Sequence, residues 1–122
     1  MLKTFWWGAS IAYTIFLTVV SLISLGDLPE LGSDFDDKLY HLGAYIVLGF
    51  LWAWVAQTTR KKNALIISLL VTLLYGIFLE MIQHKLNPTR TFDLVDMLSN
   101  CIGVGFGTII AAFVYKQKVK LN

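Results

Sequence analysis

The stretch that decides the fold is "ALIISLLVTLLYGIFLEMI", residues Ala64–Ile82, which runs for 19 residues with a single charged side chain, Glu80, near its end. About 20 mostly apolar residues in a helix are needed to cross a hydrocarbon core about 30 Å thick. This segment therefore predicts a transmembrane helix that carries a carboxyl group close to one membrane surface.

The composition of the whole chain indicates the same environment. Of the 122 residues, 57% are hydrophobic and 15% are charged, and the mean hydropathy is +0.67. Soluble domains carry about a quarter charged residues, and a domain of this size leaves about a third of its unfolded-chain surface in water. We therefore expect one integral membrane domain, residues 1–122, in contact with the lipid bilayer.

Three other segments are long and apolar enough to cross a bilayer. They lack the alternating pattern, in units of about ten residues, that a transmembrane barrel requires. The first is longer than the 7–15 apolar residues of a signal peptide, so we expect an uncleaved helix. The sequence predicts an all-α, polytopic membrane protein, a bundle of four transmembrane helices over about residues 5–25, 39–56, 64–82 and 94–115.

Charge predicts the orientation of this bundle. Seven of the ten Lys and Arg residues lie at the amino terminus, in the middle loop or in the carboxyl-terminal tail: Lys3, Arg60, Lys61, Lys62, Lys116, Lys118 and Lys120. The positive-inside rule then places both termini in the cytoplasm. All eight acidic residues fall on the other side. We expect a multi-pass membrane protein with its polar chemistry on the extracytoplasmic side.

Polar residues recur at helical spacing in three of the predicted helices. Residues three or four apart share one face of a helix, and three such faces are formed by Asp37, His41 and Tyr45, by Gly76, Glu80 and Gln83, and by Asp93, Asp96, Asn100, Gly103 and Gly107. The last two glycines have a spacing that allows close helix approach. Polar groups within spans usually face the bundle interior. We therefore expect one outward-opening pocket, with Lys38 and Arg90 as counter-charges.

These residues carry a resemblance to a known family. The ordered series "DKLYHLGAY", "EMIQ" and "PTRTFDLVDMLSNCIGVGFG", from Asp37 to Gly107, resembles the VanZ-like integral membrane proteins. The resemblance implies a multi-pass protein of the bacterial inner membrane with a role in the cell envelope and, for some members, altered sensitivity to the glycopeptide antibiotic teicoplanin. It implies no particular reaction.

The first functional hypothesis is an enzyme that acts on a lipid-linked or cell-wall phosphate. Lys38 and Arg90 would hold the anionic group, His41 would be acid, base or nucleophile, and Glu80 or Asp96 would orient it. The candidate catalytic residues are His41, Glu80 and Asp96. The candidate ligand-binding residues are Asp37, Lys38, Tyr45, Gln83, Arg90, Asp93 and Asn100.

The alternative is a non-catalytic membrane protein that binds a lipid or protein partner through the same pocket. His41 is equally explained as an interior histidine bonded to a carboxylate, Asp93 as a helix N-cap and Asn100 as an interhelical hydrogen-bonding residue. A metal site is disfavoured because the spacings match no metal motif and two cations are nearby. The expected partners are the bilayer and an anionic lipid or lipid-linked phosphate, with no nucleic acid, and no cofactor is assigned.

The aromatic residues near the predicted cytoplasmic ends of the spans have a simpler interpretation. Tryptophan and tyrosine are enriched at membrane–water interfaces. We expect interfacial or lipid-facing positions for Trp6, Trp7, Trp52, Trp54 and Tyr115.

Overall fold

The computed structural model of the chain describes residues 2–23, 34–86 and 94–121. The described residues form four α-helices and no strand. Their bounds are α1 Leu2–Ile23, α2 Asp34–Thr58, α3 Ala64–Leu86 and α4 Leu94–Leu121. The all-α prediction with four helices is confirmed.

Three of the four helices are long and apolar enough to span a membrane by themselves. The apolar windows are Lys3–Leu22 in α1, Ala64–Ile82 in α3 and Met97–Val119 in α4, whereas α2 has a shorter apolar stretch, Leu42–Thr58. The helix itself continues beyond that stretch, because α2 has 25 residues and therefore a length of about 37 Å at 1.5 Å per residue. Together the four helices make this a multi-pass membrane protein.

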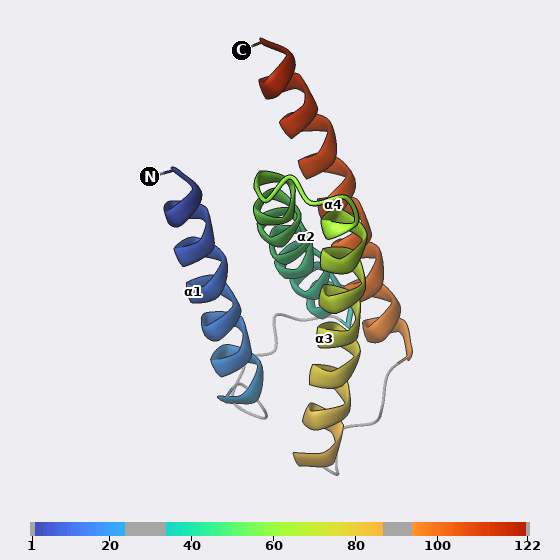
Figure 1. Cartoon of the computed structure of the whole chain (residues 1–122). Coiled ribbons are helices and arrows are strands. Elements are labelled where there is room, and N and C mark those ends of the chain that lie inside the picture. The colour runs from blue at the N-terminus through green and yellow to red at the C-terminus, as the bar shows by residue number, and fades with distance from the viewer. Residues whose placement is uncertain (1, 24–33, 87–93, 122) are drawn as a thin grey trace.

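Both ends of the chain lie at the same end of the bundle (Figure 1). The start of α1, the end of α4 and the connection between α2 and α3 are found there, and we call it the terminal end. The start of α2, the end of α3 and the start of α4 lie at the other end, which we call the opposite end.

Helix α2 lies at the centre of the bundle and packs against α1, α3 and α4. Its buried side includes Tyr45, Leu48 and Val55. A helix surrounded by protein has less contact with lipid, so it needs a shorter apolar stretch than its neighbours. This explains how the helix with the shortest apolar stretch can occupy this position.

Helices α2 and α4 approach each other most closely where glycine replaces a side chain. A Cβ atom on Gly49 of α2 would lie 2.5 Å from the Val104 carbonyl oxygen, and one on Gly103 of α4 would lie 2.7 Å from the Leu42 carbonyl oxygen. A Cβ atom on Gly107 would collide with the Ile46 carbonyl oxygen. The predicted close approach at Gly103 and Gly107 is confirmed, and it brings α4 against the backbone of α2.

Hydrogen bonds attach α1 to the other helices. The Trp52 Nε1–H donates to Thr14 Oγ1 over 2.8 Å, and the Tyr13 hydroxyl donates to the Ala44 carbonyl oxygen over 2.7 Å. The hydroxyls of Thr18 and Tyr75 are 2.5 Å apart. Because lipid offers no polar partners, such contacts specify helix association inside a membrane.

The outer surface of the bundle is apolar on all four helices. Examples are Phe16 on α1, Val47 on α2, Leu74 on α3 and Ile109 on α4, whose side chains are 42–70% exposed. A soluble protein rarely exposes apolar patches on this scale, whereas lipid is a suitable solvent for them. We conclude that this surface contacts the bilayer.

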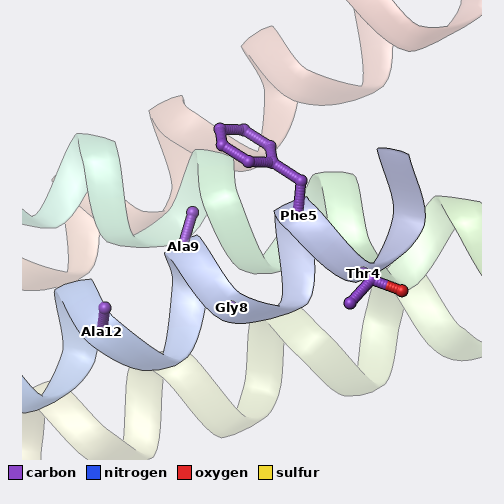
Figure 2. A pocket seen from close by; sticks show the side chains of 5 residues that line it. All are labelled: Thr4, Phe5, Gly8, Ala9 and Ala12. Atoms are coloured by element: carbon purple, nitrogen blue, oxygen red, sulfur yellow. The ribbon is translucent and has the colours of Figure 1, made fainter. Parts of the chain in front are cut away.

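A shallow hollow on the surface of α1 follows from its small residues. It lies over Gly8, and the other residues around it, all on the same helix, are Thr4, Phe5, Ala9 and Ala12 (Figure 2). Nothing lies within 4 Å of the place that a Gly8 Cβ would occupy. The hollow is open and belongs to the lipid-facing surface.

Candidate functional site

Three helices meet at Gly76 of α3. A Cβ atom on this glycine would lie 3.1 Å from Tyr45 Cε1 of α2 and 3.4 Å from Asn100 Cβ of α4. An alanine here would require the Tyr45 ring to shift by a few tenths of an ångström, so the glycine lets α3 pack closely against the tyrosine ring and the asparagine at once. The structure thus brings together Tyr45 and Asn100, two of the residues predicted from helical spacing.

The Tyr45 side chain is held from several directions. A Cβ atom on Gly103 would lie 3.0 Å from Tyr45 Cβ, so α4 supports the base of the side chain. The Tyr75 ring of α3 lies beside it, with 6.4 Å between the ring centroids. Tyr45 is 3% exposed, and these contacts restrict its ring to the junction of the three helices.

Glu80 completes the described part of this polar cluster. It follows Gly76 by four residues and therefore lies on the same face of α3, one turn closer to the opposite end. Its side chain is 3% exposed and lies within electrostatic range of Tyr45. Burial of a charged group is costly, and carboxyl groups inside membrane spans are candidates for function.

Asn100 belongs to the same buried group. Its side chain is 2% exposed on α4, and its amide offers both donors and acceptors. Tyr45, Glu80 and Asn100 therefore contribute a hydroxyl, a carboxyl and a carboxamide from three different helices. We call these three residues the buried polar cluster.

The other predicted site residues lie outside what the structure describes in full. Five belong to helices whose backbone is described, although their side chains are not: Asp37, Lys38 and His41 in α2, Gln83 in α3 and Asp96 in α4. Arg90 and Asp93 fall in the segment 87–93, which is outside the described residues. The helix bounds place the first five at the opposite end, the end to which Glu80 belongs.

Sequence reasoning missed residues that shape this site. Gly49 was not singled out, although it follows Tyr45 by four and continues the same face of α2. Tyr75 also escaped notice, and its ring lies beside Tyr45. Helical spacing from Tyr45 is sufficient to predict that Gly49 shares its face of α2. The position of Tyr75 cannot be predicted in this way, because it depends on the rotation of α3 relative to α2.

The interpretation of the aromatic residues needs correction at one position. A lipid-facing position is wrong for Trp54, which is 5% exposed. Its ring packs between Trp6, with centroids 5.0 Å apart, and Tyr115, with centroids 5.2 Å apart. The ring is buried because α1 and α4 converge on α2 at the terminal end, which a single helical segment cannot reveal.

Comparison with known proteins places the chain in a family. Residues 7–115 match the VanZ/LLP1 family. An uncharacterized protein of the fission yeast Schizosaccharomyces pombe (strain 972) is 26% identical over 110 residues, which cover 90% of this chain and 67% of the relative. No solved structure matches the chain. The matched region includes all of α2 and α3, most of α1 and α4 and the whole buried polar cluster, and the chain belongs to the VanZ/LLP1 family.

Proposed function

We propose that this protein is a VanZ-like component of the bacterial envelope that binds a lipid-linked or cell-wall phosphate at the opposite end of the bundle, on the extracytoplasmic side of the inner membrane. The observation that carries the proposal is the buried polar cluster, because Tyr45, Glu80 and Asn100 come from three helices and are each no more than 3% exposed. Burying three such groups in a membrane bundle is costly unless they are hydrogen-bonded.

In this proposal the buried polar cluster forms the inner wall of the pocket. Lys38 and Arg90 bind the phosphate oxygens at its mouth, because cationic donors make short, strong hydrogen bonds to phosphate. Asp37, Gln83 and Asp93 complete the polar lining. The bulk of the ligand, an apolar chain, extends into lipid beside the exposed apolar surface of the helices.

A catalytic version of the same site assigns proton transfer to His41. Histidine changes its charge near neutral pH, and Glu80 or Asp96 would orient its ring. The non-catalytic version needs only the hydrogen-bonding groups. The described cluster favours recognition, because Asn100 is neither an acid nor a base and Tyr45 is held in a fixed position by Gly103 and Tyr75.

Reconstituted protein tests both versions. The chain in liposomes is given undecaprenyl phosphate and undecaprenyl pyrophosphate, and lipid binding and phosphate release are measured for the wild type, His41→Ala and the matched variant His84→Ala. Phosphate release that His41→Ala alone abolishes supports catalysis. Binding without release supports the binding protein. Neither binding nor release would contradict the proposed ligand class.

The proposed link to glycopeptides is tested in cells. Expression of the wild-type chain in a teicoplanin-sensitive bacterium is expected to change the inhibitory concentration of the antibiotic, and Asn100→Leu is expected to remove the effect. Asn100→Leu keeps the branching at Cγ and the number of non-hydrogen side-chain atoms and deletes the hydrogen-bonding groups. An effect that persists in this variant would mean that the buried polar cluster is not the site responsible.

A further inference from the structure

A second cavity, of about 240 Å³, lies at the terminal end of the bundle, at the other end of the helices from the buried polar cluster. It is formed where the start of α1, the end of α2 and the last turns of α4 come together. Its wall combines three cations, Lys3, Arg60 and Lys118, with three aromatic rings, Trp6, Trp54 and Tyr115.

The charge of this cavity is one-sided. All eight Asp and Glu residues of the chain lie within residues 27–37 and 80–96, away from the segments that form the terminal end. The residues that line the cavity include three cationic side chains and, among those the structure describes, no carboxylate. Three positive charges around one small space attract an anion.

The aromatic residues fix the position of one of these cations. The Nζ atom of Lys118 lies 5.5 Å from the centroid of the Trp54 ring, within the range of a cation–π interaction. Trp54 is itself buried between Trp6 and Tyr115. The ammonium group of Lys118 therefore lies over a buried aromatic ring.

Arg60 stands in an unusual backbone conformation. Its φ is +58°, in the left-handed region that glycine adopts most easily. Its N–H donates to the Gln57 carbonyl oxygen over 3.2 Å in the turn that ends α2. Non-glycine residues in this region concentrate at functional sites. Arginine therefore occupies a turn position at which glycine would have a lower conformational energy.

We propose that this cavity binds the phosphate group of an anionic phosphate ester. Arg60, Lys3 and Lys118 supply charge-assisted hydrogen bonds to the phosphate oxygens, and the aromatic rings contact the carbon skeleton of the ester. The volume is below the range of about 300–1,000 Å³ typical of drug-sized ligands, so it suits a small group such as a phospholipid head group or a soluble sugar or glycerol phosphate.

The simpler explanation of these cations is that they only orient the chain in the membrane. Orientation depends on how many Lys and Arg residues a side carries, whereas binding depends on which ones line the cavity. Lys61, Lys62 and Lys116 belong to the same end, are exposed and do not line the cavity. They therefore provide a control of equal charge.

The test compares two triple variants of the full chain. One removes the cavity cations (Lys3→Gln, Arg60→Gln and Lys118→Gln), and the other removes the outlying lysines (Lys61→Gln, Lys62→Gln and Lys116→Gln). Native mass spectrometry from neutral detergent measures binding of phosphatidylglycerol, with phosphatidylcholine as the net-neutral lipid and glycerol 3-phosphate as the soluble competitor. We expect the first triple to weaken phosphatidylglycerol binding by about tenfold or more and the second to leave it nearly unchanged.

The arms distinguish the source of the phosphate. Displacement of the lipid by glycerol 3-phosphate supports a site that accepts soluble esters, and retention of the lipid supports a head-group site. Equal losses in the two triples, or no loss in either, would overturn the proposal.

A single variant separates binding from folding. Arg60→Gly removes one cation and relieves the left-handed backbone. We expect an unchanged or higher melting temperature together with weaker phosphatidylglycerol binding. A higher melting temperature with full binding would show that Arg60 has no part in the site and would contradict the proposal.

Discussion

A Cβ atom on Gly76 would lie 3.1 Å from Tyr45 Cε1, so the tyrosine ring of α2 occupies the space that a side chain on α3 would need. The same Cβ atom would lie 3.4 Å from Asn100 Cβ of α4. The absence of a side chain at Gly76 therefore lets α3 pack close to both α2 and α4. The buried polar cluster exists at this point because the glycine admits both neighbours.

The first prediction follows from that distance. Gly76→Ala is expected to lower the stability of the bundle by about 1–3 kcal/mol, the usual range for overpacking, because the Tyr45 ring must move. Gly8→Ala is the matched control, since nothing lies within 4 Å of its Cβ position, and it is expected to be neutral or stabilising. Denaturation of the purified protein in detergent measures both. Equal melting temperatures would show that Tyr45 yields without cost.

The contact between α2 and α4 gives a sharper contrast within a single helix. Gly103→Ala and Gly107→Ala each place a methyl group against the backbone of α2, which cannot rotate away, whereas a Cβ atom on Gly105 meets nothing within 4 Å. We expect a loss of about 3 kcal/mol or more at the first two positions and none for Gly105→Ala. Yield and thermal unfolding of the three variants test this. A stable Gly107→Ala protein would contradict the packing of α4 on α2.

The hydroxyl pair that attaches α1 to α3 is open to a double-mutant cycle. Thr18 Oγ1 and the Tyr75 hydroxyl are 2.5 Å apart. The variants Thr18→Val, Tyr75→Phe and the double mutant are expected to give a coupling energy of about 0.6 kcal/mol and no more than about 1.7 kcal/mol, the range measured inside membranes. The measurement is unfolding in detergent. A coupling of zero would mean that α1 is held by its other contacts alone.

Much of this fold follows from the sequence. Apolar length alone predicted four helices, and the described part of each predicted span lies within a helix. Residues 24 and 25, the predicted end of the first span, lie outside the described residues. The actual helices also continue into charged residues, because a helix need not end where the hydrocarbon core does. The spacing of Gly103 and Gly107 correctly predicted a close approach.

The relations between helices could not be predicted in the same way. Helical spacing places Gly76 on a polar face of α3. The contact between Gly76 and the Tyr45 ring depends in addition on how α3 is rotated and shifted along α2. The burial of Trp54 likewise depends on α1 and α4 closing over it. Helical spacing gives the face that a residue occupies, whereas the neighbour of that face is a property of the assembled bundle.

The orientation of the bundle is a prediction from the distribution of Lys and Arg. Asn63 is exposed in the connection between α2 and α3, and Asn87 follows the last residue of α3 and lies outside the described residues. In intact cells, Asn87→Cys is expected to react with a membrane-impermeant thiol reagent, and Asn63→Cys only after permeabilisation. The reverse pattern would place the buried polar cluster near the cytoplasm and would contradict its proposed role.

The final prediction separates the charged residues of the proposed site from its histidine. If Glu80, Arg90 and Asp96 compensate one another, Arg90→Ala leaves a charge in a poorly hydrated place, and breaking a buried pair in this way costs about 3–5 kcal/mol. Glu80→Gln, at a side chain that is 3% exposed, is expected to lower the yield or the melting temperature as well. His41→Ala removes a group that is stable in its neutral form, so it is expected to fold normally and to lose any proton-transfer activity toward lipid phosphates. Unfolding in detergent and the liposome assay measure the two properties independently. A His41→Ala protein that is both stable and fully active would exclude histidine from the mechanism, and the binding-protein alternative would then be the better explanation of the site.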